Sequence, residues 1–197
     1  MTRALSVACQ CGAFRAEIHD PHAASCNHAI CYCKDCQAFA QHLGQGPHVL
    51  DFAGGTDLFQ TQPSQVRIIS GADKLAVLQL APKGLYRWHT TCCNTALCNT
   101  MGTPKLSFVG FMTANITERD ALPPVTIKYK PEHATAPVPK PHGSLLRFAG
   151  FTIRNLLKAR ITGSWKKNPF FGDDARSVVK PYLLSEAERD AAYRQVT

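Results

Sequence analysis

The stretch Cys31-Tyr-Cys-Lys-Asp-Cys36 gathers three cysteines within six residues, and the rest of the chain is interpreted around it. Three thiolates this close together can hold one Zn²⁺ and leave its fourth position open, which is how catalytic zinc sites are built. A side chain from Cys26 or His28 would instead close the site. A redox pair formed by Cys33 and Cys36 is a further interpretation, but no βαβ pattern accompanies it.

Two further half-sites, Cys9-Gln-Cys11-Gly12 and Cys92-Cys93, predict a second metal site. A Cys-x-Cys at the end of a strand places both side chains on the same side of the backbone. A glycine after it permits a tight turn that directs backbone amides at sulfur. Cys92 and Cys93 are the nearest match for the other half, and adjacent cysteines can share one ion only within a turn. We therefore expect a closed structural zinc site.

The cysteine count favours metal over disulfides. Nine is odd, and the spacings are close. Cys26 and Cys98 stand apart and are interpreted as small buried apolar residues. The N-terminus lacks the apolar run of a secretory signal, and no stretch approaches the roughly 20 apolar residues of a transmembrane segment. A reducing, cytoplasmic location is expected, and the sequence carries no signal for oligomeric state.

Hydrophobic patterning divides the chain into three parts. Residues 1–130 predict a mainly β zinc-binding domain, 131–143 a Pro-rich linker, and 144–197 a basic helical C-terminal extension. A short helix is expected over Cys36–His42. The predicted strands cover Leu5–Ala8, Phe14–Ile18, Val66–Ile69, Leu75–Leu80, Leu106–Met112 and Val125–Tyr129.

The C-terminal part carries the charge. The net charge is +8, and the segment 125–180 accounts for it with eleven Lys/Arg against three Asp/Glu. Helical periodicity over Ser144–Ile161 places Leu145, Leu146, Ala149, Ile153, Leu156, Leu157 and Ile161 on one face. The favoured interpretation is that this face packs on the β domain. Ser185-Glu-Ala-Glu188 is a capping box and predicts a last helix.

The order and spacing of the cysteines over residues 1–125 resemble the glutathione-dependent formaldehyde-activating enzyme family, whose wider group includes centromere protein V-like proteins. The resemblance rests on Cys9-x-Cys11-Gly12, Cys31-x-Cys33-x-x-Cys36 and a late cysteine followed by Asn94-Thr-Ala-Leu97. It implies a β-tent fold with two zinc ions. A structural ion would be held by Cys9, Cys11 and Cys93, and a catalytic-type ion by Cys31, Cys33 and Cys36.

The chain departs from the family pattern at the last half-site, which in the family reads Cys-x-x-Cys-Gly. Here Thr90 stands in the place of the first cysteine and Asn94 in that of the glycine. The fourth structural ligand is then Cys92 or, as a fallback, His89.

The activity implied by the resemblance is carbon–sulfur lyase chemistry on thiol–aldehyde adducts such as S-hydroxymethylglutathione. A small thiol such as glutathione would take the open zinc position. Lys34, Arg15 and Arg87 are candidate partners for its carboxylates, and Asp35 and His42 are candidate proton carriers.

The alternative function is a non-catalytic zinc-stabilised module whose basic tail contacts a membrane, nucleic acid or a protein. The predicted helix over Ser144–Ile161, followed by Lys166-Lys167, would then lie on an anionic membrane surface or on nucleic acid. Aromatic residues interleaved with basic ones are sparse, which argues against nucleic-acid recognition.

Overall fold

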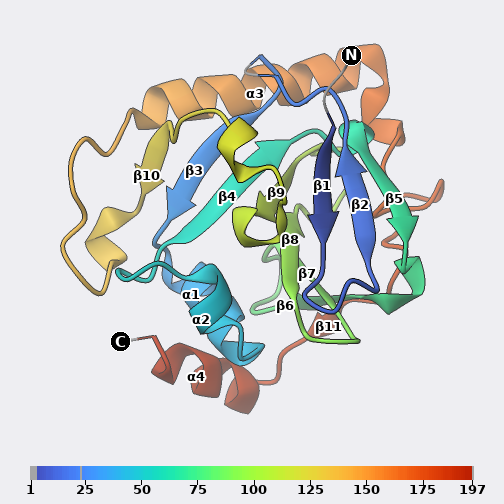
Figure 1. Ribbon diagram of the computed structural model, residues 1–197. Helices are drawn as coiled ribbons and strands as arrows, with labels where there is room; N and C mark the ends of the chain where they lie inside the picture. The colour runs from blue at the N-terminus through green and yellow to red at the C-terminus, as the bar shows by residue number, and fades with distance from the viewer. Residues whose placement is uncertain (1–3, 23, 197) are drawn as a thin grey trace.

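The computed structural model describes residues 4–22 and 24–196, which form a mainly β fold with helices around it (Figure 1). The strands are β1 (Leu5–Ala8), β2 (Arg15–Ile18), β3 (Asn27–Cys31), β4 (Thr56–Thr61), β5 (Val66–Ser70), β6 (Leu75–Gln79), β7 (Tyr86–Thr90), β8 (Ala96–Thr100), β9 (Val109–Met112), β10 (Ile127–Tyr129) and β11 (Tyr182–Leu183). The α-helices are α1 (Lys34–His42), α2 (Gly46–Val49), α3 (Leu145–Thr162) and α4 (Glu186–Arg194).

The strands form one large mixed sheet and one small antiparallel sheet. The large sheet has the order β10-β3-β4-β9-β8-β7-β6-β11, and the small one β1-β2-β5. Pairing in the large sheet is antiparallel except at its edges, where β10 runs parallel to β3 and β11 parallel to β6. Both edge strands come from beyond residue 125, so the C-terminal part of the chain completes the sheet on both sides.

The main core lies between the two sheets. Strand β1 alternates as a half-buried strand should, with Leu5 and Val7 inside and Ser6 outside. These side chains pack with Phe111 and with Trp88, whose indole N–H donates to the Thr100 hydroxyl at 2.9 Å. Burial of these large side chains without an unpaired indole nitrogen stabilises the junction of the sheets.

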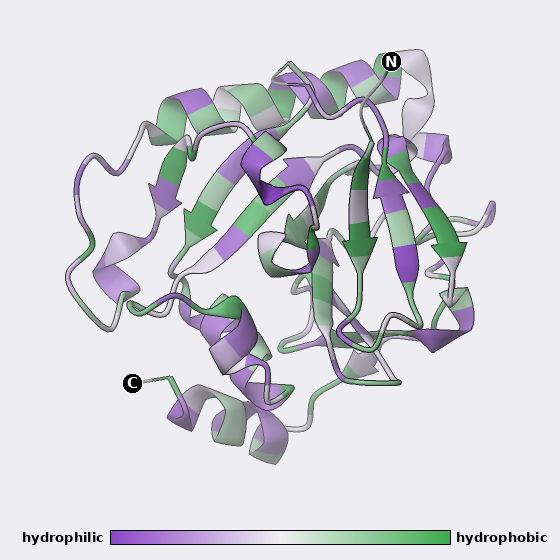
Figure 2. Cartoon of the chain, in the orientation of Figure 1, coloured by the Kyte–Doolittle hydropathy of each residue, from purple (hydrophilic) through white to green (hydrophobic). Residues whose placement is uncertain are grey.

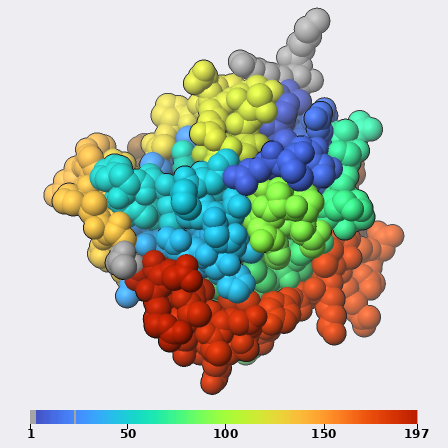
Figure 3. Space-filling view, turned by 60° about the horizontal axis from the view of Figure 1, so that its bottom comes forward, coloured from blue at the N-terminus to red at the C-terminus, as the bar shows by residue number. Residues whose placement is uncertain are grey.

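A second core forms around helix α1. Its buried side chains include Phe39, together with Met112 from the sheet and Leu184 and Ala192 from the C-terminal end. Helix α4 packs against α1, and Figure 3 shows the C-terminal segment, in red, next to the part of the surface formed by α1 and α2. The Ser185 hydroxyl and the Glu188 side chain form the predicted capping box at the start of α4.

Side chains from the C-terminal part pack into the core of the β part. Phe170 is only 2% exposed, and its ring centroid lies 4.9 Å from that of Trp88 in the main core. The Pro-rich segment is also tied to the β part, because Thr135 donates its N–H to the Ala53 carbonyl at 3.0 Å. Residues 131–196 therefore contribute to the core that the described residues before them begin.

Helix α3 is predicted correctly in extent but not in orientation. Ser144 caps it, accepting from the Arg147 N–H at 3.4 Å, and the helix lies along one side of the molecule (Figure 1). Its inward face carries the buried Asn155 and Ala159, whereas Leu146 and Ile161 are each 86% exposed. The expectation that the apolar face packs on the β domain is wrong, because that face points to solvent.

Within the described residues, no helix combines the length and apolarity that crossing a membrane requires.

Candidate metal centres

The first cysteine cluster joins the end of β1 to the turn between β7 and β8. Cys9 follows β1 directly, and Gly12 has a φ of 75°, so the chain reverses tightly after Cys11. Cys92 and Cys93 lie in the turn that leaves β7, and Asn94 adopts the left-handed conformation with a φ of 53°. The predicted turn is therefore present, and it lets two adjacent cysteines face the same point.

The four sulfur atoms are spaced as a tetrahedral zinc site requires. The Sγ atom of Cys9 lies 3.5 Å from that of Cys11 and 3.8 Å from that of Cys92. The Cys11–Cys92 and Cys92–Cys93 sulfur distances are 3.3 and 3.7 Å. A tetrahedron with Zn–S bonds of about 2.3 Å has edges of roughly 3.8 Å. Cys9, Cys11, Cys92 and Cys93 can therefore hold one metal ion.

Hydrogen-bond donors lie next to the sulfur atoms of Cys9 and Cys93. The Phe14 N–H donates to Cys9 Sγ at 3.3 Å, which is the amide–sulfur contact that the Cys-x-Cys-Gly pattern predicts. The Thr95 and Thr90 hydroxyls lie 3.0 and 3.4 Å from Cys93 Sγ. Partial burial opposes ionisation of this thiol, but the two hydroxyls and contacts with Cys11 lower its pKa to about 5.

Cys92, and not the fallback His89, is grouped with the other three cysteines. Burial lowers the pKa of His89, which favours the neutral ring. Arg15 lies beside this cluster on β2 and donates its Nε–H to the Gly12 carbonyl at 3.3 Å.

The second cluster sits where β3 passes into α1. Cys31 ends the strand, Cys33 occupies the N-cap position, and Cys36 lies in the first turn of the helix. The predicted helix over Cys36–His42 thus begins two residues earlier, at Lys34. The buried Gln37 side chain fixes the loop by donating to the Tyr32 and His133 carbonyls at 2.7 and 3.0 Å.

Cys31, Cys33 and Cys36 form a three-sulfur group in which all ligand atoms lie within 4.8 Å of one another. Hydrogen bonds from Cys31 and Cys33, with the Arg87 charge acting against burial, hold the pKa of Cys36 well below its ordinary value. Contacts with Cys33 and Cys36, together with burial, raise the pKa of Cys31. Only a cation among the sulfurs would allow all three thiols to ionise together.

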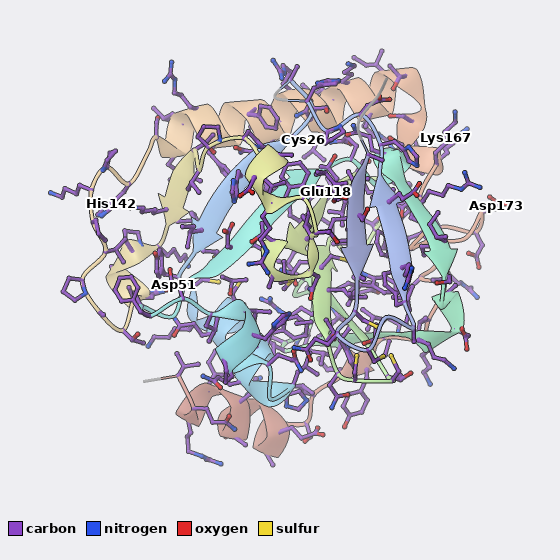
Figure 4. The ribbon with its side chains drawn as sticks, viewed as in Figure 1. Cys26, Asp51, Glu118, His142, Lys167 and Asp173 are labelled. Atoms are coloured by element: carbon purple, nitrogen blue, oxygen red, sulfur yellow. The ribbon has the colours of Figure 1, made fainter. Side chains whose placement is uncertain are left out.

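Neither Cys26 nor His28 supplies a fourth ligand. Cys26 precedes β3, at the opposite end of the strand from Cys31, and lies below α3 (Figure 4). It belongs to the main hydrophobic core, as does Cys98, so the apolar interpretation of both is confirmed. The His28 ring contacts the Pro123 carbonyl and the Asp57 carboxylate, each at 2.6 Å. Within residues 4–22 and 24–196, the group contains no fourth Cys, His, Asp or Glu.

Arg87 is the cation next to this group. Its side chain is 3% exposed, and its Nη1 lies 3.8 Å from Cys36 Sγ and 3.4 Å from the Asn99 side-chain oxygen. Its guanidinium also lies over the Phe39 ring, 5.5 Å from the centroid, and 3.7 Å from the Asp35 carboxylate. The negative sulfurs, first through Cys36, raise the pKa of Arg87 against the effect of burial.

The three cysteines line a cavity of about 520 Å³. Lys34, Asp35 and Arg87, which were predicted to act here, also line it, whereas the predicted Arg15 and His42 do not. The Tyr193 hydroxyl, from helix α4, donates to Asp35 at 2.7 Å. Burial and the Asp35 carboxylate raise the pKa of Tyr193 to about 12, so this hydroxyl keeps its proton near neutrality.

Several lining residues were not predicted from the sequence. They include Leu58, Asn99, Phe108, Tyr129, Lys130, His133, Phe148 and Tyr193. They come from the interior strands β4 and β8, from the edge strand β10 and the turn after it, from the loop before β9, and from α3 and α4. No spacing in the sequence connects them to the cysteines. Their mixture of aromatic, apolar and basic groups makes the cavity suitable for a small organic ligand that carries negative charge.

Comparisons with known proteins give a family but no activity. Residues 1–175 match the model of a family described as "Family of unknown function (DUF6151)". No curated protein matches the chain. The crystal structure of a Rhodobacter sphaeroides protein matches with a TM-score of 0.41 and 18% identity, over 57% of this chain and 88% of that one.

Proposed function

Because the chain belongs to the DUF6151 family, whose description assigns no activity, we propose its function from the two cysteine clusters. We propose a two-zinc protein with a β-tent fold, related to the glutathione-dependent formaldehyde-activating enzymes. One zinc ion is structural and the other binds a small thiol. The observation that carries the proposal is the three-sulfur group of Cys31, Cys33 and Cys36, which opens onto a cavity and has no fourth protein ligand among the described residues.

The structural ion is assigned to Cys9, Cys11, Cys92 and Cys93. Four thiolates complete a tetrahedron, so no position is left for a ligand. The ion would join the end of β1 to the β7–β8 turn, and thus the small sheet to the large one. All-thiolate ligation favours zinc over harder cations.

The second ion is assigned to the three-sulfur group, and its fourth position to a thiol in the cavity. When bound there, zinc lowers the pKa of the incoming thiol and keeps it as the nucleophilic thiolate. Arg87 balances the negative charge of the three cysteines. Lys34 and Lys130, at the wall of the cavity, are placed to attract carboxylates of a ligand such as glutathione.

The proposed reaction joins this thiolate to a small aldehyde. A C–S bond forms, the carbonyl π electrons move to oxygen, and that oxygen gains one proton to give a hemithioacetal, balancing the proton that the thiol lost on ionising. The reverse is a carbon–sulfur lyase reaction. Tyr193 lines the cavity with a protonated hydroxyl, and we assign it the proton, with Asp35 as its positioning partner.

Metal content tests the assignment of the ions. We expect two zinc ions per purified chain by inductively coupled plasma mass spectrometry. The Cys11→Ser and Cys33→Ser chains should each carry one. If the intact chain carries a single ion and the Cys33→Ser chain still carries it, the assignment of a second site is wrong.

Cobalt substitution tests thiol binding without relying on turnover. In the cobalt-loaded chain, glutathione should strengthen the sulfur-to-cobalt charge-transfer band and give a saturable heat in titration calorimetry. The Cys11→Ser chain, which keeps the second site, should respond in the same way, and Cys33→Ala should not. If neither glutathione nor another small thiol changes the charge-transfer band or gives a saturable heat with the intact chain, the proposal is wrong.

A further inference from the structure

Helix α3 presents to solvent an apolar stripe that the proposed function does not use. Its members are Leu146, Ile153, Leu157 and Ile161, which are 86%, 56%, 57% and 86% exposed. Together with Gly150 they recur every three or four residues and so share one face of the helix. In Figure 2 the ribbon of α3 carries hydrophobic bands, in green, along its length. A stripe of large apolar side chains of this length marks an interaction surface.

The exposed stripe is opposite to the face that holds the helix in place. The inward face carries the buried Asn155 and Ala159. Arg154 fixes the helix further, since its guanidinium donates to the Ala24 carbonyl at 2.8 Å and lies 5.2 Å from the Phe151 ring centroid. The stripe is therefore exposed while α3 is packed on the rest of the protein. Its exposure does not require the helix to detach.

Positive charge flanks the stripe, and the segment that carries the stripe contains no acidic residue. Between His133 and Gly172 the sequence contains no Asp or Glu. The same span contains Lys140, Arg147, Arg154, Lys158, Arg160, Lys166 and Lys167. All six basic residues from Arg147 onward are exposed, and Lys167 lies near the C-terminal end of α3 (Figure 4).

An aromatic residue follows the helix. Trp165 lies with its ring 5.1 Å from the Arg160 guanidinium carbon and 5.9 Å from the Lys166 Nζ. Tryptophan with adjacent cations is typical of the interface between lipid headgroups and hydrocarbon. Leu and Ile on one face and Lys and Arg beside them complete the pattern of a helix that lies in the plane of a membrane.

We propose that the outer face of α3 docks on an anionic lipid surface. The apolar stripe would enter the boundary between headgroups and acyl chains, and the basic residues would pair with lipid phosphates and carboxylates. Two other occupants fit less well. A second copy of the chain would bring two strongly positive surfaces together. A nucleic acid would neutralise the charges but leave the stripe in water.

Vesicle co-sedimentation of the full zinc-loaded chain tests the proposal. Binding is expected to vesicles of phosphatidylcholine with phosphatidylserine, to be weak with phosphatidylcholine alone, and to fall as salt screens the charges. The triple variant Leu146→Ser, Ile153→Ser, Leu157→Ser should bind at least about tenfold more weakly, because its apolar area is lost. Circular dichroism would verify that this variant folds.

A matched control replaces three exposed apolar residues elsewhere. The control variant carries Phe52→Ser, Ile69→Ser and Val178→Ser, at residues that are 77%, 49% and 53% exposed. It should bind vesicles as the intact chain does.

Three outcomes would overturn the proposal. One is an intact chain that does not sediment with anionic vesicles, and another is a stripe variant that binds as well as the intact chain. The third is a dimer, seen by analytical ultracentrifugation, that the stripe variant dissociates while vesicles have no effect.

Discussion

The Arg87 guanidinium lies 3.8 Å from the Cys36 sulfur although the Arg87 side chain is only 3% exposed. A buried cation persists where it has charged partners, and here the partners are the three-cysteine group and the Asp35 carboxylate, 3.7 Å away. A Zn²⁺ ion with three thiolates carries a net charge of −1, which one guanidinium balances. The pairing therefore links strand β7 of the sheet to the three-cysteine group at the start of α1.

Replacing Arg87 by methionine should selectively weaken the second ion. Methionine keeps much of the side-chain volume but leaves the sulfurs without a positive neighbour, so zinc affinity at this site should fall by about 10- to 100-fold. Competition with a chromophoric chelator measures the loss, and the first ion should be unaffected. Arg15→Met, an exposed arginine beside the other cluster, is the control. Equal zinc affinity in the intact and Arg87→Met chains would contradict the pairing.

Replacing Tyr193 by phenylalanine should loosen helix α4 and slow the proposed reaction. The variant loses the 2.7 Å hydrogen bond to Asp35, which we expect to cost about 1 kcal/mol of unfolding free energy. Hydrogen exchange should quicken in α4, while zinc content should stay the same. Tyr182→Phe removes another tyrosine–carboxylate bond, from Tyr182 to the capping residue Glu188, at a position away from the cavity. If both variants lose thiol–aldehyde chemistry equally, the assignment of the proton to Tyr193 is wrong.

The sequence predicted the local features of the metal sites and not their surroundings. Cys9 and Cys11, like Cys33 and Cys36, are brought together by two or three residues of backbone, so spacing alone identifies them. The turn that aligns Cys92 with Cys93 was also foreseeable, because adjacent side chains on a strand diverge. By contrast, the contact of Asp35 with Tyr193 joins residues that are 158 positions apart.

Two physical causes account for the errors in the fold. Strands β3, β4, β7 and β8 and the two-residue β11 were not predicted. The first four carry polar side chains, such as Thr90, Asn99 and Thr100, that are buried here. Hydropathy alternation does not identify such strands. The orientation of α3 was wrong because periodicity locates an apolar face but does not say what covers it. Phe148 and Phe151, from another face of the helix, turned out to line cavities of the protein.

Replacing Phe170 by alanine should destabilise the whole protein. Its ring is packed against Trp88 and lies 6.5 Å from the Phe111 centroid, so the substitution leaves a cavity in the main core. We expect the unfolding free energy to fall by about 3–5 kcal/mol. Urea unfolding followed by tryptophan fluorescence measures the change, and Val178→Ala, at an exposed position nearby, serves as the control. A loss below about 1 kcal/mol would mean that the C-terminal part is a dispensable extension after all.

The contribution of Asp57 to stability should depend on pH through His28. Burial disfavours the charged imidazole, but the hydrogen bonds to Asp57 and to the Pro123 carbonyl outweigh it, so the pKa of His28 is raised above 6.5. A raised histidine pKa stabilises the fold below the unfolded value, and this stabilisation is lost as the pH rises through the folded value. Asp57→Asn should therefore lower the unfolding free energy by about 1 kcal/mol at about pH 5.5 and by markedly less at about pH 9.

Urea unfolding across this pH range measures the difference. Glu17→Gln, which alters an exposed carboxylate 3.2 Å from His19, should change stability little at either pH. A cost of Asp57→Asn that grows with pH would show that His28 is held in its neutral form.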